Sequence, residues 1–468
     1  MLGKYKRLGK NTLIVFIGNI GSKLLSFIML PFYTRWLSVE DYGVADLINS
    51  YAVLFLGIVS CCITESIFIF PKKVGKDART EYLTSTIYFC IAMIVLSGLF
   101  FSIINRIPQE TTLCTYSMAI WGIMSTSLLQ SLTQQFARSI DKMFIFGFTG
   151  IFHAIAVFGL SIMLIPQLGV DGYIYSIMIA NIITAIFAFL LYKGYDYFRF
   201  NAASKTKLIE MLKYSIPLVP NSVMFWVIGT LNRPLMESYC GLHTLGLYAI
   251  AIRVASIVSI VSSIFFSSWQ ISVLEEFGTK SYSTFYNKVI KVVSFGLIIV
   301  FFMTSMLSST ILKVLTTPEF YGANQFIPLL MLGTILSAFS SFVAATFSAA
   351  RVSKYYLYSS LLSSIAAIAL NFILIPKFSI FGALIAYVVS FGVMAISRVI
   401  YSWKFVKLDK VCNYILLSCM CLLYAVLYYR YGNSLILVVL GSVTCCALGY
   451  KIVVPFKDHI VRNKQKGI

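Results

Sequence analysis

Apolar stretches of about 20 residues recur along the whole chain, and each is bounded by charged residues or by Pro and Gly clusters. A stretch of this length crosses a bilayer as a helix. The pattern therefore predicts an all-α polytopic membrane protein with fourteen transmembrane helices. The expected helices cover residues 12–34, 44–69, 82–104, 113–137, 143–165, 171–192, 214–238, 245–274, 289–312, 326–350, 355–375, 380–403, 411–429 and 434–454.

The composition agrees with this class and excludes a soluble enzyme. Of the 468 residues, 59% are hydrophobic and 12% are charged, and the mean hydropathy is +0.87. In soluble domains, roughly a quarter of all residues are charged. Fourteen helices leave residues only for loops and two tails, so we expect no extramembrane domain of ordinary size.

The formal charge is +20, and the distribution of the basic residues along the chain indicates which loops face the cytoplasm. Of the 37 Lys and Arg residues, 29 fall in alternate loops and both tails on one side of the predicted membrane, and five fall on the other side. The positive-inside rule assigns the richer side to the cytoplasm. We therefore expect both termini to be cytoplasmic, with membrane lipids as partners of the basic loops and no nucleic-acid partner.

Two parts of the chain repeat each other. Leu164-Ile165-Pro166 followed by Gly172 matches Leu374-Ile375-Pro376 followed by Gly382, with an offset of 210 residues in both parts. Duplicated halves are typical of transporters.

The repeat predicts two pseudo-symmetric six-helix lobes of the same orientation. The N-lobe covers residues 1–192 and the C-lobe covers residues 214–403, with a cytoplasmic linker at 193–213. Residues 404–468 add two further helices and a basic cytoplasmic tail.

Three stretches resemble the polysaccharide transporter family of the multidrug/oligosaccharidyl-lipid/polysaccharide exporter superfamily, which includes O-antigen and capsule repeat-unit flippases. Residues 23–43 read K-L-L-S-F-I-M-L-P-F-Y-T-R-W-L-S-V-E-D-Y-G and resemble the opening signature of that family. Residues 214–221, Y-S-I-P-L-V-P-N, are similar to its Y-S-x-P-x-x-P segment. Residues 246–251, G-L-Y-A-I-A, are similar to its G-x-Y-x-x-A segment.

The chain also departs from that family. Where the family often has Asp-Arg in the seventh helix, this chain has Asn232-Arg233, and where Trp-x-Pro often ends the eighth helix it has Trp269-Gln270-Ile271. The acidic partner in the second lobe is therefore missing from its usual position, and an ion-coupling residue must be sought elsewhere.

Lys23 and Arg253 fall inside the first and eighth predicted helices. A charge that faces lipid is costly, so such groups normally line a wet cavity or find a partner. One interpretation is a structural ion pair or a side chain that snorkels to the interface. The other follows from the resemblance, which implies a polyisoprenyl-diphosphate-linked oligosaccharide as substrate: fixed cations would replace the water that the diphosphate loses.

Several other charged residues have two interpretations each. Arg233 and Glu237 are four residues apart on one helix face and can form a local pair or part of a substrate site. Arg35 and Asp46, at the outer ends of the first two helices, are candidates for an outer gate. Glu65 precedes basic residues at the cytoplasmic end of the second helix, so it is either an interfacial ion-pair partner or an ion-coupling carboxylate.

Amide side chains cluster in two places. Gln130, Gln134 and Gln135 recur at helical spacing in the fourth helix, and Asn19 shares a face with Lys23. Amides suit sugar hydroxyls, but they also hold helices together in membranes. The three histidines form no metal or catalytic cluster, and no cofactor is expected.

We therefore predict a non-enzymatic flippase of the bacterial cytoplasmic (inner) membrane. In this hypothesis, lipid-linked oligosaccharide repeat units cross by alternating access of two lobes, for surface polysaccharide biosynthesis, with other polysaccharide assembly proteins as further partners. The first alternative is a multidrug/cation antiporter of the same superfamily, which would require an acidic cavity. The second is a membrane polysaccharide polymerase or ligase, but the longest outer stretch, 313–325, holds one acid, Glu319.

Overall fold

The computed structural model describes residues 27–432 and 434–465, and it confirms the predicted all-α polytopic class. The described residues form α-helices and short 3-10 helices without a strand. Eight helical segments of this part are long and apolar enough to cross a membrane. Two of them, α8 (Met143–Leu191) and α15 (Lys354–Ser402), are 49 residues long and each contain two of the predicted spans.

The chain divides into two compact units. Of the described residues, unit 1 holds those up to Trp226 together with Gly241–Gly246, and unit 2 holds Val227–Cys240 and those from Leu247 onward. The boundary falls within α10 (Val219–Thr230) and α11 (Asn232–Ala255), and α11 is interrupted by a non-helical Gly241.

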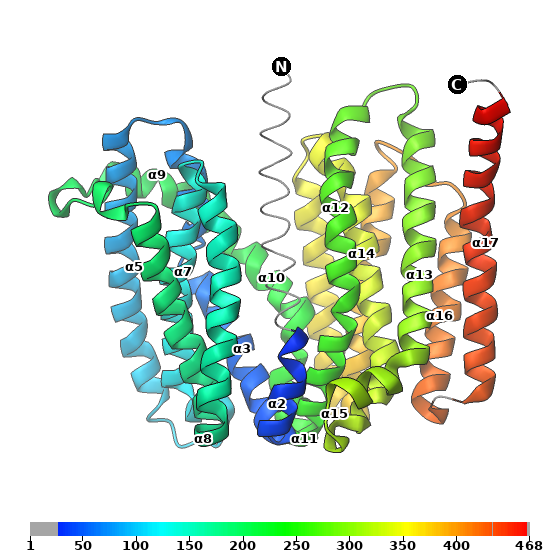
Figure 1. The fold of residues 1–468 in the computed structure, drawn as a ribbon, viewed down its shortest axis with the longest axis horizontal. Helices are drawn as coiled ribbons and strands as arrows, with labels where there is room; N and C mark the ends of the chain where they lie inside the picture. Colours follow the sequence, from blue (N-terminus) through cyan, green and yellow to red (C-terminus); the bar gives the residue numbers. More distant parts are fainter. Residues whose placement is uncertain (1–26, 433, 466–468) are drawn as a thin grey trace. The chain divides into compact units, whose positions relative to one another are not determined.

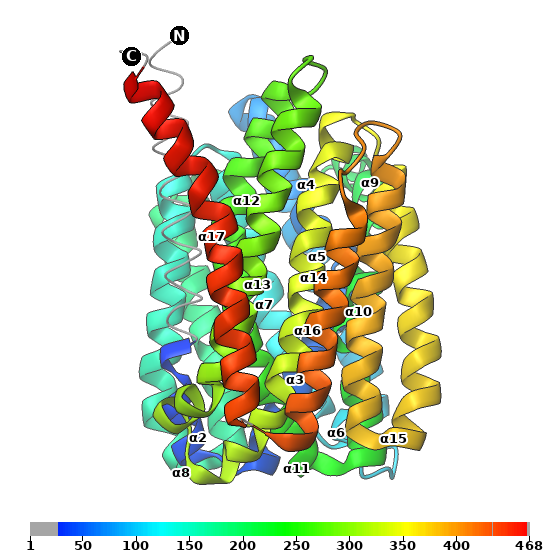
Figure 2. The ribbon, with the colours of Figure 1, turned by 90° about the vertical axis from the view of Figure 1, so that its right-hand side faces the viewer.

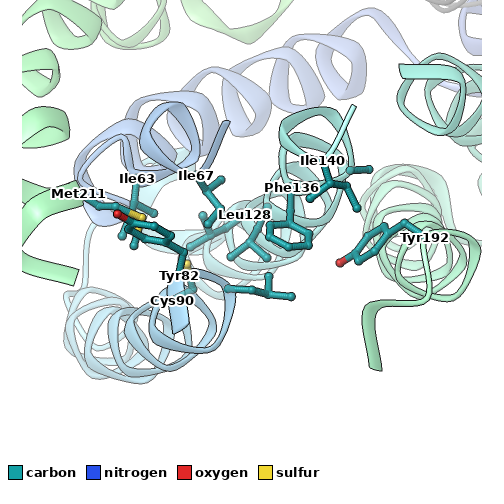
Figure 3. Packing of buried hydrophobic residues seen from close by; sticks show 12 residues of the cluster. Ile63, Ile67, Tyr82, Cys90, Leu128, Phe136, Ile140, Tyr192 and Met211 are labelled. Carbon is teal, nitrogen blue, oxygen red and sulfur yellow. The ribbon is translucent and has the colours of Figure 1, made fainter. Parts of the chain in front are cut away.

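Unit 1 is a bundle of helices with a packed apolar interior at the end that carries α4 and α9. Besides α8, its helices are α2 (Leu30–Trp36), α3 (Val39–Val59), α4 (Ile63–Ile69), α5 (Lys76–Ile104), α6 (Thr112–Thr115), α7 (Ser117–Ser139) and α9 (Lys205–Ser215). Figure 3 shows buried side chains from α4, α5 and α7 meeting around Leu128 and Phe136, with Met211 of α9 alongside. The linker helix α9 is thus part of the core and not a free connection.

The described part of the family-like opening signature forms α2 and the start of α3. The Ser38 hydroxyl accepts a hydrogen bond from the amide of Asp41 at 3.1 Å, and the Asp41 carboxylate accepts one from the amide of Ser38. This capping box satisfies backbone donors that the first turn of a helix leaves free. A Cβ on Gly43 would lie 2.9 Å from the backbone nitrogen of Gly246, so these two motif glycines let the segments approach.

The repeat appears as two helical hairpins with matching turns. The backbone turns at Gly169 (φ 56°, ψ −127°) in α8 and at Ser379 (φ 52°, ψ −134°) in α15, and these residues are 210 positions apart. A Cβ on Gly172 would meet the Leu164 carbonyl oxygen at 2.3 Å, and one on Gly382 would meet that of Leu374 at 2.2 Å. Glycine is therefore required where the second arm leaves each turn. Figure 1 shows α8 folding back on itself.

Some predicted helices are divided differently in the structure. The expected helix 44–69 ends as α3 at Val59, because Cys61 and Cys62 adopt left-handed conformations (φ 49° and 52°) before α4 begins. The expected helices 214–238 and 245–274 are replaced by the shorter α10, the kinked α11 and α12 (Ile257–Glu276). The hydrophobic pattern is continuous through these breaks, so the breaks could not be predicted from it.

Unit 2 packs its helices around α14 (Ile327–Ala349). They are α12, α13 (Tyr282–Leu315), α15, α16 (Val411–Tyr431) and α17 (Leu435–Gln465), with the 3-10 segment η5 (Pro318–Phe326) before α14. Figure 2 shows α17 running along α13. The hydroxyl of Tyr428 on α16 lies 2.9 Å from Ser308 Oγ on α13, and Ser308 donates to Asn324 at 2.6 Å.

Candidate functional site

A cation held by aromatic rings occupies the last turn of α7 in unit 1. The guanidinium carbon of Arg138 lies 4.0 Å from the ring centroid of Phe68 on α4 and 5.4 Å from that of Phe146 on α8. A cation is attracted to the face of an aromatic ring at such distances. The Nε atom of Arg138 is buried and has no hydrogen-bond partner among the described residues. Arg138 therefore presents a fixed positive charge with an unused donor.

Polar side chains precede this cation along α7, and an acidic one lies on α4. Glu65 on α4 is exposed and interacts electrostatically with Arg138. Gln134 donates from Nε2 to Thr149 Oγ1 on α8 at 3.2 Å, which ties α7 to α8. Gln135 has a buried Oε1 without a hydrogen-bond partner in the described part of the chain, and Gln130 is half-buried one turn earlier. This group is called the α7 polar cluster below.

A second arginine site lies in unit 2 at the start of α11. Arg233 is 8% exposed, donates from Nη1 to the Gly229 carbonyl at 3.1 Å, and lies 5.6 Å from the Tyr248 ring centroid. The neighbouring Asn232 donates from Nδ2 to the Tyr248 hydroxyl at 2.5 Å. Glu237 is half-buried one turn further along the same helix, as its sequence spacing requires.

The other predicted residues lie apart from these two groups or outside the described chain. Arg253 is half-buried in the last turn of α11. Arg35 is exposed in the last turn of α2, and Asp46 is half-buried in α3, so their pairing as a gate stays a prediction. Lys23 and Asn19 fall outside the described residues.

Sequence reasoning assigned Arg138 and Arg398 to the cytoplasmic surface and missed that Arg398 is buried and that Arg138 is half-buried with a buried Nε atom. Arg398 is 3% exposed in α15, where it donates to Ser359 Oγ and Ser340 Oγ at 3.2 Å each. The burial of Arg398 could have been predicted from the sequence, because this residue lies within the predicted apolar stretch 380–403.

His153 and Asn181 were also missed as a pair. Their side chains meet across the α8 hairpin, with Nε2 of His153 2.9 Å from Oδ1 of Asn181. They are equidistant from residue 167 in the predicted Pro/Gly turn, which would have indicated the contact. The described residues hold no group of three or more His, Cys, Asp or Glu side chains placed to bind a metal ion.

Comparison with known proteins gives both sequence and structural relatives. A family model described as "Polysaccharide biosynthesis protein" matches residues 8–270. Lsg locus protein 1 of Haemophilus influenzae (strain ATCC 51907 / DSM 11121 / KW20 / Rd) is 26% identical over 263 residues, which cover 54% of this chain and 62% of that protein. The chain thus matches about three fifths of the length of that relative.

Solved structures share the fold at low sequence identity. The lipid II flippase MurJ in an inward closed conformation superposes with a TM-score of 0.67 at 14% identity, covering 96% of this chain and 99% of that one. An inward-facing multidrug resistance MATE family transporter of the MOP superfamily gives a TM-score of 0.63 at 13% identity, with coverages of 88% and 98%. A mutant of the Vibrio cholerae MATE transporter VcmN gives 0.59 at 13%, with coverages of 86% and 98%.

Proposed function

Because the chain belongs to the polysaccharide biosynthesis protein family, we propose that it is a flippase for polyisoprenyl-diphosphate-linked oligosaccharides. It moves single repeat units across the bacterial cytoplasmic membrane by alternating access, for the synthesis of a surface polysaccharide. The family match and a fold shared with a flippase and with multidrug transporters support this class of activity.

The observation that carries the proposal is the setting of Arg138. Its guanidinium is fixed between two rings, and its buried Nε lacks an acceptor among the described residues. Phosphate oxygens are the acceptors that best match a guanidinium, and charge-assisted hydrogen bonds are roughly twice as strong as neutral ones. We assign Arg138 to the diphosphate of the substrate on the cytoplasmic side.

The remaining candidate residues take roles along the same path. Lys23, Arg233 and Arg253 supply further positive charge for the diphosphate. Asn19, Gln130 and Gln134 supply amides for sugar hydroxyls, although the bond from Gln134 to Thr149 equally supports helix packing. Arg35 with Asp46 would close the outer side, and Glu65 and Glu237 are candidates for ion coupling.

The antiporter and enzyme hypotheses receive less support. The MATE-like fold is compatible with a drug/cation antiporter, but the buried charges of the described chain are the arginines Arg233 and Arg398, which suit an anionic substrate. A polymerase or ligase would need an outer catalytic segment. The outer stretch around Glu319 instead folds as η5 and buries Phe320, Ala323 and Phe326 in unit 2.

A strain deleted for the gene tests the proposal. We expect undecaprenyl-linked repeat units to accumulate on the cytoplasmic leaflet and surface polysaccharide to disappear, since export is blocked while synthesis continues. The location of the lipid-linked units can be measured by their accessibility to a glycosidase in intact and in broken cells. Unpolymerised units at the outer surface would favour the enzyme hypothesis, and unchanged glycans would favour the antiporter.

A further inference from the structure

A hydrogen-bonded network crosses the middle of unit 1 and is not part of the site above. His153 lies on the first arm of α8 and contacts Asn181 on the second arm, which is 2% exposed. Asn181 donates from Nδ2 to Thr126 Oγ1 at 3.1 Å and to Ser127 Oγ at 3.0 Å, both on α7. One amide therefore connects the imidazole on the first arm of α8 to two other helical segments, the second arm and α7.

The network fixes which histidine nitrogen carries hydrogen. Thr126 donates its own hydroxyl hydrogen to the Gly122 carbonyl at 2.8 Å, so its oxygen accepts from Asn181. Flipping the Asn181 amide would set Oδ1 against that oxygen. Oδ1 therefore faces His153, and Nε2 of His153 must donate to it. The neutral ring is then the Nε2–H tautomer, and Nδ1 keeps a free lone pair that can bind a proton.

The repeat shows that the hairpin does not need a titratable group here. The position 210 residues after His153 is Ser363, whose hydroxyl donates to the Ser390 carbonyl on the opposite arm of α15 at 2.7 Å. A serine is thus sufficient to join the two arms. An ionisable side chain inside a membrane helix is costly to keep and is by default a candidate for function.

Among the described residues, no charged side chain interacts electrostatically with His153. The elements packed against α8 carry charged groups at Arg35 of α2, Glu40, Asp41 and Asp46 of α3, Arg138 of α7, and Asp196 of the 3-10 helix η2 (Gly194–Asp196). On α8 itself the charged residue is Asp171, beside the turn. The phenols of these elements and their caps include Tyr33, Tyr42, Tyr51, Tyr116, Tyr173, Tyr175, Tyr192 and Tyr195. A proton on His153 would therefore add a charge that no described group cancels.

We propose that His153 is the proton-binding site through which unit 1 couples transport to a proton gradient. This inference rests on the proposed function and names its coupling ion. Nδ1 takes a proton from water on the acidic side and forms an N–H bond, and the same proton returns to water when that bond breaks on the other side. Protonation leaves the Nε2–H bond to Asn181 in place and makes it charge-assisted, which tightens the link to α7.

The first test is a titration that needs no substrate. The full-length protein with ¹⁵N-labelled histidine, in lipid nanodiscs, contains three histidines, and the His153→Gln variant identifies the resonance of His153. We expect the Nε2–H tautomer at alkaline pH and a second N–H at Nδ1 on acidification. The Nδ1–H tautomer, or a ring that stays neutral wherever the protein stays folded, would overturn the proposal.

The second test is export in the deletion strain. The permanently neutral His153→Gln keeps a donor toward Asn181, and Ser363→Ala is the matched control at the equivalent hairpin position. At equal membrane abundance we expect His153→Gln to lower export by about tenfold and Ser363→Ala to change it by less than about twofold.

The outcomes separate the two proposals. Full export by His153→Gln would refute the proton role and leave the flippase intact. If deletion itself causes no accumulation of lipid-linked units, the flippase fails, and the titration alone then decides whether His153 binds a proton.

Discussion

The buried arginines Arg233 and Arg398 and the half-buried Arg138 differ in what compensates their charge. Arg398 donates to two serine hydroxyls, and Arg233 donates to a backbone carbonyl beside a tyrosine ring. Arg138 faces two phenylalanine rings and retains a buried Nε–H without an acceptor among the described residues. A buried hydrogen-bond donor of a cation that lacks an acceptor is costly. An anionic ligand that accepts from it therefore gains more binding free energy at Arg138 than at the other two arginines.

Replacing Arg138 tests this assignment at the residue scale. We expect Arg138→Gln to lower surface polysaccharide by about tenfold, which corresponds to one lost charge-assisted contact of about 1.4 kcal/mol. Arg138→Lys keeps the charge but not the planar stacking, so its export should be intermediate. Surface polysaccharide is quantified in the complemented deletion strain at equal protein abundance.

Arg106→Gln provides the control, because Arg106 is exposed near the end of α5 and should export normally. Wild-type export by Arg138→Gln would exclude Arg138 from the substrate path.

At the scale of elements, each hairpin depends on close backbone approach at one glycine. The second arm of α8 begins where Gly172 passes the carbonyl of Leu164, and α15 repeats this arrangement at Gly382 and Leu374. A backbone atom cannot move aside as a flexible side chain can. The arms then stay antiparallel, and this geometry brings His153 to Asn181.

A methyl group at this glycine should therefore destabilise the hairpin. We expect Gly172→Ala to lower the free energy of unfolding by about 1–3 kcal/mol, the usual cost of overpacking. The unfolding temperatures of purified variants in one detergent give the comparison. Gly159→Ala on the same helix is the control, since a Cβ there has no neighbour within 4 Å, and it should be neutral or stabilising by up to about 1 kcal/mol. Equal unfolding temperatures for the two variants would show that the turn tolerates a Cβ.

The break between α3 and α4 is a second feature of this scale. Two consecutive non-glycine residues, Cys61 and Cys62, have positive φ, which costs of order 1–3 kcal/mol each. The amide of Cys62 donates to Ser60 Oγ at 3.2 Å and offsets part of this cost. The break sets the direction of α4, and α4 carries Glu65 of the α7 polar cluster and Phe68, whose ring faces Arg138.

At the scale of the whole molecule, the distribution of basic residues sets the orientation. One span more or fewer would move all following loops to the other side and destroy the split of 29 to five basic residues. The split therefore constrains the number of spans. If the C-terminus is cytoplasmic, as this distribution predicts, a C-terminal green fluorescent protein fusion should fluoresce, and a C-terminal alkaline phosphatase fusion should be inactive. Both activities are measured in whole cells at matched expression. An active phosphatase would reverse the predicted orientation and move Arg138 to the outer side.

The sequence alone determined the class of the molecule and much of its organisation. The length of the apolar stretches is a local property that a bilayer selects directly, so the all-α polytopic fold followed from it. The repeated Pro/Gly turn marked both hairpins, because Gly172 and Gly382 are fixed by local backbone geometry. The motifs at residues 23–43, 214–221 and 246–251 indicated a family, and the family match over residues 8–270 confirmed it.

Tertiary structure decided which polar residues act together. Arg138 was counted as a surface charge, yet Phe68 and Phe146 reach it from two other helices. The tautomer of His153 depends on a chain of donors that ends at Gly122 on another element. Hydropathy and spacing report only which face or stretch a residue belongs to. Contacts between side chains distant in sequence arise when helices pack, so they are decided by the fold.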